Sequence, residues 1–111
     1  MSSPTKRTLE KLRKNGWIPA IVEKFNSFDQ KRHDLFGFID ILAIKDNETL
    51  GIQATSYGHG AKRKNKILEN KIYPKVKQAN WRVEVWEWKK VKKLSKENKI
   101  YYRYQAKITV L

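Results

Sequence analysis

The stretch RHDLFGFIDILAIKDNETLGIQATS, residues 32–56, decides how this chain is organised. It contains two apolar runs, residues 35–44 and 50–55, and each run carries one internal polar side chain, Asp40 in the first and Gln53 in the second. The short polar link KDNE between the runs predicts a turn, so we expect an antiparallel hairpin. In such a hairpin Asp40 and Gln53 would lie side by side and point the same way.

Asp40 is the more informative of the two polar residues. Its neighbours Phe38, Ile39, Ile41 and Leu42 are apolar, which argues against exposure on either face of a strand. A buried carboxylate costs several kcal/mol unless it is paired or binds a cation. In a chain so rich in positive charge, the pattern predicts a metal site that faces a polyanion. The alternative is an edge-strand Asp that faces water.

The overall composition is that of one small, basic, globular domain over residues 1–111. Lys and Arg total 25 and Asp and Glu total 11, which gives a net charge of +14, and 40% of the residues are hydrophobic. Such an excess of positive charge predicts a polyanionic partner, most often nucleic acid. The alternative is a basic surface that serves only solubility.

The sequence lacks the features of a disulfide framework, of a cysteine or all-histidine metal site, of a membrane span and of a signal peptide. Without Cys, the chain has neither disulfides nor thiolate zinc sites, and two His residues are too few for an all-histidine site. No stretch approaches the ~20 apolar residues of a membrane span. The N-terminal sequence has no apolar core of a signal peptide. We therefore expect an intracellular protein with no membrane partner.

Before the hairpin, the sequence predicts a helix and a strand. Ser3 and Pro4 are suited to cap and start the helix, and Gly16 to end it. A strand is expected over residues 17–25, followed by a polar loop over residues 26–34.

After the hairpin, a helix is expected from residue 61, kinked or restarted by Pro74. A Val- and Trp-rich strand over residues 81–88, a basic turn region over 89–99 and a last edge strand over 100–110 complete the chain. The resulting fold class is α/β: an αβββαβ core with a mixed sheet flanked by helices, and an extra C-terminal strand.

Residues 6–91 resemble the PD-(D/E)XK nuclease superfamily, in particular its small Holliday-junction-resolvase-like members. The resemblance depends on Glu23 near the first strand, Asp40 in GFID, and the strand GIQAT after the short link. The form DLFGFID…QATS is similar to a divergent group found in phage-type genes of this superfamily. The resemblance implies a restriction-endonuclease-like fold, Mg²⁺ or Mn²⁺, a DNA substrate and often a homodimer.

The chain departs from the family pattern at two positions, where Gln53 and Thr55 replace an acidic residue and a Lys. The Gln53 amide oxygen can still bind Mg²⁺ but contributes no charge, so another carboxylate has to help. Glu23 and Asp34 are the candidates, and the Ala54 carbonyl is a further possible ligand. The alternatives are a surface ion pair for Glu23 and a turn or capping role for Asp34.

Thr55 cannot replace a lysine that steadies the reacting phosphate, so another cation has to do so if the chain is an enzyme. Lys62 and Lys66 are the first candidates because they share a face of the next helix. The alternative is a solvated face that binds phosphate non-specifically. His33 and His59 flank the two motif strands and are candidates for a general base or for simple surface contacts.

Basic residues after the motif strands are expected to bind nucleic acid through its phosphates. They are Lys62, Arg63, Lys64, Lys66, Lys89 and Lys90. The sequence thus predicts a metal-dependent DNA endonuclease, with resolvase-like action on branched DNA left open. One alternative is a catalytically decayed nucleic-acid-binding module on the same fold, favoured by the changes at positions 53 and 55. Another is a basic RNA-binding protein without a metal.

Overall fold

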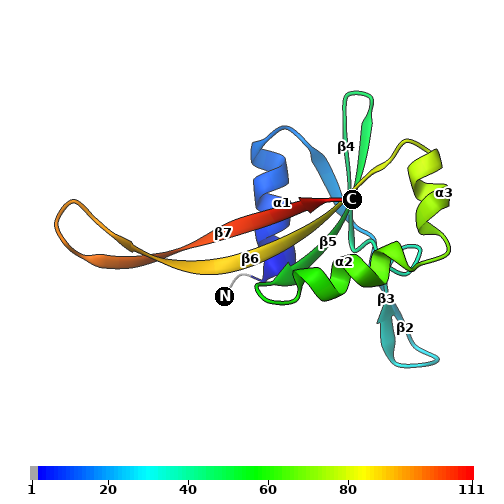
Figure 1. Cartoon of the computed structure of the whole chain (residues 1–111), viewed down its shortest axis with the longest axis horizontal. Helices are drawn as coiled ribbons and strands as arrows, with labels where there is room; N and C mark the ends of the chain where they lie inside the picture. The colour runs from blue at the N-terminus through cyan, green and yellow to red at the C-terminus, as the bar shows by residue number, and fades with distance from the viewer. Residues whose placement is uncertain (1–2) are drawn as a thin grey trace.

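The computed structural model describes residues 3–111, in which three helices surround a five-stranded sheet and a small separate hairpin (Figure 1). In chain order the elements are α1 (Pro4–Lys14), β1 (Ile18–Ile21), β2 (Lys24–Asn26), β3 (Lys31–His33), β4 (Ile41–Lys45), β5 (Glu48–Ser56), α2 (Gly60–Leu68), α3 (Tyr73–Gln78), β6 (Arg82–Leu94) and β7 (Ile100–Val110). Strands β2 and β3 form the separate hairpin.

The main sheet has the strand order β1-β4-β5-β6-β7. Strands β5 and β6 are parallel, and every other neighbouring pair in this sheet is antiparallel. A parallel pair needs a crossover connection, which α2 and α3 supply between β5 and β6. The predicted α/β class, with a mixed sheet, flanking helices and a last edge strand, is confirmed.

The first helix begins and ends where the sequence predicts. The Ser3 hydroxyl accepts a hydrogen bond from the Lys6 N–H at 3.1 Å, and Pro4 takes the first helical position. After the helix, Gly16 has a φ of +88°, a left-handed conformation that favours glycine. The second predicted helix is restarted at Pro74, so that it forms the separate helices α2 and α3.

Two apolar clusters fill the two faces of the sheet, because alternate residues of a strand point to opposite sides. The cluster under α1 contains Leu12, Ile41, Ala43, Leu50, Ile52, Trp86 and Trp88. The cluster under α2 and α3 contains Phe38, Ile39, Ile67, Val76, Val83 and Val85. Gln53 and Thr55 lie in β5 opposite Val85 and Glu87 of β6, on the face that α2 covers.

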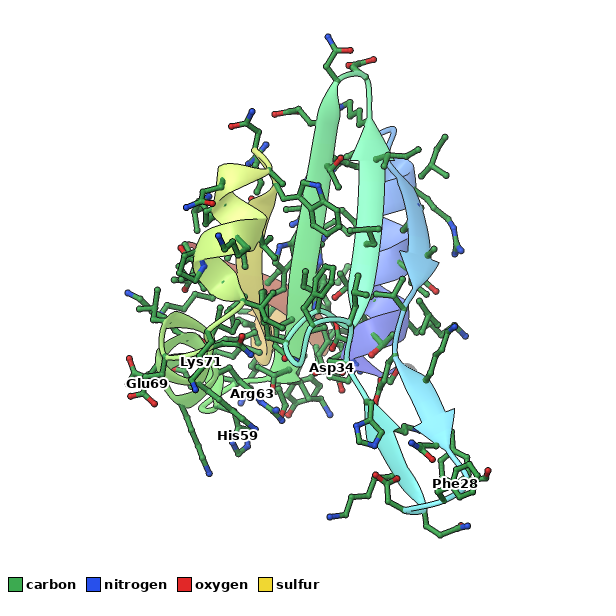
Figure 2. The ribbon with its side chains drawn as sticks, turned by 90° about the vertical axis from the view of Figure 1, so that its right-hand side faces the viewer. Phe28, Asp34, His59, Arg63, Glu69 and Lys71 are labelled. Carbon is green, nitrogen blue, oxygen red and sulfur yellow. The ribbon has the colours of Figure 1, made fainter. Side chains whose placement is uncertain are left out.

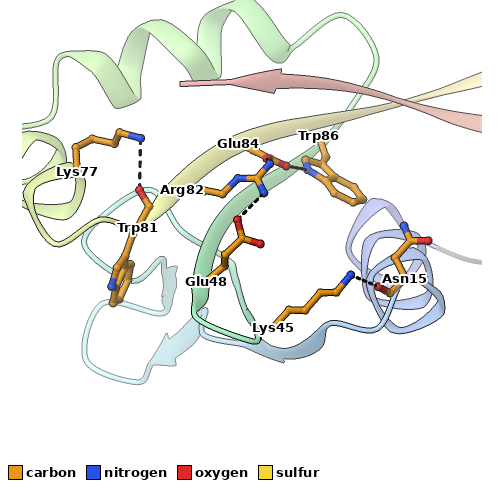
Figure 3. Close-up of polar contacts among 8 residues, drawn as sticks. All are labelled: Asn15, Lys45, Glu48, Lys77, Trp81, Arg82, Glu84 and Trp86. Atoms are coloured by element: carbon orange, nitrogen blue, oxygen red, sulfur yellow. Dashed lines mark hydrogen bonds and ion pairs between the residues drawn. The ribbon is translucent and has the colours of Figure 1, made fainter.

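Polar residues of the first cluster's face are paired within the protein. Glu84 is buried, and its carboxylate accepts hydrogen bonds from Trp86 Nε1 and from the Arg82 guanidinium, each at 2.9 Å (Figure 3). Lys45 Nζ donates to the Asn15 carbonyl at 2.8 Å and so ties β4 to the end of α1. The buried carboxylate of Glu84, which has a structural role, is therefore paired with a cation, Arg82.

The predicted strand over residues 35–44 is wrong in its first half. The structure has a turn at residues 35–40, and β4 begins only at Ile41. The reason is the backbone at Phe36 and Gly37, whose φ values of +56° and +86° are left-handed and incompatible with a strand. Asp40 therefore lies at the entrance to β4 instead of in the middle of a strand.

The region before this turn also differs from the prediction. The expected strand over residues 17–25 is divided into β1 and β2, and the expected polar loop over residues 26–34 contains β3. The chain leaves the sheet after β1, where the Val22 N–H bonds to the Asp40 carbonyl at 3.0 Å. The short hairpin that follows projects away from the sheet, and Asp34 lies between it and α2 in the view of Figure 2.

The predicted basic turn over residues 89–99 is wrong as well, because β6 continues to Leu94. The actual turn is short and is closed by Ser95, whose hydroxyl accepts from the N–H groups of Glu97 and Lys99 at 3.3 and 3.0 Å. Lysine stems can lie along an extended strand, so a run of Lys does not by itself end one.

Candidate functional site

The side chains of Asp40 and Gln53 lie in contact, as the sequence predicts. Gln53 Nε2 donates to Asp40 Oδ2 at 3.0 Å, and the Ala54 N–H lies 3.2 Å from both carboxylate oxygens. The Asp40 N–H in turn bonds to the Ile52 carbonyl at 3.0 Å. Backbone groups of β5 therefore fix the Asp40 carboxylate at one end of the β4–β5 pair, where it is only 5% exposed.

Burial raises the pKa of the Asp40 carboxyl to about 7. The Ala54 N–H opposes this rise, while the negative charges of Asp34 and Glu23 add to it. Both candidate helper carboxylates are thus close enough to Asp40 to act on its charge. Among the residues that the structure describes, no ion pair neutralises Asp40, in contrast to Glu84.

Asp34 is the second carboxylate of this region, and it is half-buried between the β2–β3 hairpin and α2 (Figure 2). Burial raises the pKa of Asp34, whereas the positive charges of Arg63 and Lys66 and the amide of Gln53 lower it. The Asp34 carbonyl also accepts from the Gly37 N–H at 3.0 Å, so the residue has the turn role that was the alternative to metal binding.

The arrangement provides oxygen donors of the kind that Mg²⁺ and Mn²⁺ prefer. Asp34 and Asp40 contribute carboxylates, and Gln53, whose Nε2 donates to Asp40 here, would present its amide oxygen to an ion after rotation of the amide group. Within residues 3–111, no group of three or more acidic or histidine side chains is close enough to form a metal cluster. A divalent ion would therefore need two carboxylates, the amide and water, which suits Mg²⁺ because it usually keeps several waters.

Basic residues of α2 form a pocket beside these carboxylates. The pocket is lined by His59, Lys62, Arg63 and Lys66. The positive charges of Arg63 and Lys66 on α2 act on the Asp34 carboxylate. Arg63, predicted only as a nucleic-acid contact, thus acts on the same carboxylate as the predicted Lys66. Lys64 is exposed on the same helix.

The remaining predicted residues contact other parts of the chain, although the charge of His33 also acts on Asp34. His33 Nε2 is paired with Asp29 Oδ2 at 2.7 Å within the β2–β3 hairpin. Lys89 Nζ lies 4.6 Å from the centre of the Tyr57 ring, and Lys90 Nζ lies 4.8 Å from that of Tyr102. These two lysines extend the basic surface along β6, away from the carboxylates.

Thr55 has a buried neighbour that sequence reasoning missed, Glu87. The Glu87 carboxylate accepts from the N–H groups of Gly58 and Gly60 at 3.0 and 3.3 Å, and Lys107 Nζ lies 4.0 Å away. Glu87 thereby fixes the loop that starts α2. The signal for it is a charged residue, Glu87, between the two tryptophans at the end of the strand sequence WRVEVWEW.

Replacing Gly60 with Ala should destabilise this end of α2. An added Cβ would overlap the buried Glu87 side chain, which is held by two N–H groups and cannot move without losing them. We expect a loss of about 1–3 kcal/mol in the free energy of unfolding, typical of overpacking. Urea unfolding measures it, with Gly58→Ala as the comparison; there a Cβ meets no atom, and only its φ of +98° is strained. An equal loss in both variants would contradict the role given to Glu87.

Comparisons with known proteins add no relative, since no family model, curated protein or solved structure matches the chain. No helix of residues 3–111 is both long and apolar enough to cross a membrane.

Proposed function

We propose that this chain is a metal-dependent DNA endonuclease with a restriction-endonuclease-like core. The observation that supports it best is Asp40, a buried carboxylate that has no cationic partner among residues 3–111. It lies beside Gln53 and within the electrostatic reach of Asp34 and Glu23. Such a group is costly to the fold unless a cation joins it, and this makes it a candidate functional site.

The order of elements supports the same interpretation. Helix α1, the antiparallel strands β1, β4 and β5, the helix α2 and the parallel strand β6 follow one another as an αβββαβ core. The small β2–β3 hairpin is inserted into this core, and β7 is added after it.

The residues divide into two chemical roles. Asp40 and Asp34, with the Gln53 amide oxygen, would hold Mg²⁺ or Mn²⁺. When bound, the ion lowers the pKa of water and neutralises charge on the scissile phosphate. Arg63 and Lys66, whose charges act on Asp34, are suited to bind that phosphate and to stabilise its developing charge.

Cleavage of DNA with and without divalent ions tests this proposal. Purified protein should cut duplex or branched DNA with Mn²⁺ or Mg²⁺ and should not cut with EDTA. Comparison of linear, nicked and four-way-junction substrates then decides whether the activity is resolvase-like. Metal-independent cleavage, or metal binding without any cleavage, would contradict a metal-dependent nuclease. Sedimentation with and without DNA tests the predicted homodimer.

The second candidate is a nucleic-acid-binding module that has lost catalysis. It is favoured by Gln53 and Thr55, which supply neither the charge of a carboxylate nor that of a lysine, and by the burial of Thr55 beside Glu87. On this alternative, DNA binds with or without Mn²⁺ and no substrate is cut.

Cations of α2 should separate into those that act in cleavage and those that act only in binding. Changing Arg63 or Lys66 singly to Met should lower turnover at saturating DNA by ~100-fold, because each positive charge acts on the carboxylate region. Changing Lys64 to Met should weaken only affinity, which lower salt restores. Single-turnover kinetics measure both effects. If neither Arg63→Met nor Lys66→Met slows an enzyme that cuts DNA, Lys62 and His59 become the next candidates.

A further inference from the structure

The end of β6 and the start of β7 form an arm that has no other strand beside it. The last residue pair between β5 and β6 is Ser56 with Trp88. From Lys89, paired with Gln105, to the turn at Ser95, β6 has only β7 as its neighbour in the described chain. This segment, residues 89–105, is here called the basic arm, and it projects from the body of the molecule (Figure 1).

The basic arm carries a disproportionate share of the positive charge. Its cations are Lys89, Lys90, Lys92, Lys93, Lys96, Lys99 and Arg103. Glu97 is its one acidic residue, so 7 − 1 gives +6 of the net charge of +14 in 17 of 111 residues. A second copy of this chain is a poor partner for such a surface, because like charges repel. A polyanion fits it.

Apart from Tyr104, whose ring is covered by the Arg7 guanidinium of α1 at 3.3 Å, the apolar and aromatic side chains of the basic arm have no core to enter. None of its residues is buried, and Leu94, Ile100 and Tyr102 remain 63%, 56% and 56% exposed. A two-stranded hairpin is only marginally stable by itself in water. An exposed apolar surface on a projecting ribbon is typical of an interaction site.

Cations and rings alternate across the two strands of the arm. Lys90 pairs with Tyr104, Lys92 with Tyr102, and the Lys90 ammonium lies 4.8 Å from the centre of the Tyr102 ring. Neighbouring residues of each strand point to opposite faces, so cations occur on both sides of the ribbon. Both faces can therefore contact phosphates at the same time.

We propose that the basic arm enters the major groove of duplex DNA as a two-stranded ribbon. The B-form major groove is about 12 Å wide and admits such a ribbon. Lysines on its two faces would bind phosphates on the two walls of the groove, while Leu94, Ile100 and Tyr102 near the end of the arm would contact base edges. This assignment rests on the proposed DNA partner, but it does not require that the DNA is cut.

Two matched double variants test the arm. Lys90→Gln with Lys92→Gln removes two exposed charges from the arm. Lys71→Gln with Lys75→Gln removes two exposed charges near α3, at the other end of the molecule (Figure 1). Binding to a short B-form DNA duplex is measured by fluorescence anisotropy over a range of salt, in EDTA so that no cleavage occurs.

The arm variant should weaken binding at least ~10-fold and make the slope of log affinity against log salt shallower by about 2. The α3 variant should change neither value appreciably. An A-form RNA duplex of equal length should bind more weakly, with little dependence on the arm, because its major groove is too narrow to admit a ribbon.

The proposal would be overturned by equal losses in the two variants or by equal arm-dependent binding to the RNA duplex. Arm-dependent binding to single-stranded DNA as strong as to the duplex would equally exclude the groove. The nuclease proposal fails separately: protein that binds through the arm but cuts nothing with Mn²⁺ refutes only the enzyme. Protein that cuts DNA while the arm variant keeps its full affinity refutes only the arm.

Discussion

Replacing Asp40 with Asn should lower divalent-dependent DNA cleavage by ~100-fold or more, while DNA binding is unchanged or stronger. Asn keeps the size of the side chain and can still accept a hydrogen bond from the Ala54 N–H. It removes the negative charge that would hold Mg²⁺ or Mn²⁺, and it also removes a repulsion between this position and the phosphates. Cleavage of a saturating DNA substrate, with binding measured in EDTA, separates the two effects.

Asp46 offers a matched control for this substitution. It lies in the β4–β5 turn with a φ of +53°, which Asn tolerates, and it contacts none of the candidate site residues. Asp46→Asn should therefore cut DNA at the wild-type rate. If Asp40→Asn also cuts at the wild-type rate, the chemistry lies elsewhere on the molecule.

The second large effect is on stability, because the pKa of Asp40 is about 7 in the folded protein against 3.8 for an ordinary Asp. Between these two values the folded chain binds more protons than the unfolded chain. The contribution of Asp40 to the free energy of unfolding must then fall as pH rises from about 4 to about 7. A shift of about three pKa units corresponds to at most about 4 kcal/mol.

Asp40→Asn cannot ionise, so it should avoid this loss. Without divalent ions the variant should be more stable than the wild type at pH 8, by roughly 2–4 kcal/mol, and nearly equal to it at pH about 3.5, below the ordinary pKa of Asp. Urea unfolding of both proteins at the two pH values measures the difference between their free energies of unfolding. The other titrating groups are the same in both proteins, so their effects cancel in this difference. Addition of Mn²⁺ should restore the wild type at pH 8. If the variant and the wild type differ in stability by the same amount at both pH values, the ionisation of Asp40 does not destabilise the folded protein.

The sequence predicts the contact at the centre of the site better than it predicts the strands that carry it. Asp40 and Gln53 were recognisable because each interrupts an apolar run, and a short polar link brings the two runs together. The turn at Phe36 and Gly37 was not recognisable, because apolar residues such as Leu35, Phe38 and Ile39 pack into the core from a turn as readily as from a strand. The pattern of apolar residues indicates which residues are buried, but it does not distinguish a turn from a strand over so short a segment.

The parts of the site that come from distant segments were harder to predict. Glu87 is separated from Gly58 and Gly60 by the whole crossover, so nothing local links them. The position of Arg63 relative to Asp34 depends on how α2 crosses the sheet, which no short motif specifies. The extension of β6 to Leu94 depends on its pairing with β7, which outweighs the low strand preference of Lys.

The register between β5 and β6 also has a consequence for how such a chain can change over evolutionary time. Because β5 ends opposite Trp88, the length of the ribbon beyond that point is independent of the packing of the sheet. Adding or removing two adjacent cross-strand pairs would change the length of the ribbon. Every remaining side chain would stay on the face where it is now. A change by a single pair would exchange the two faces at the tip. The two-residue period of a strand thus allows the reach of the ribbon to vary in steps of two pairs, while the contacts among Asp40, Gln53 and Ala54 are unchanged.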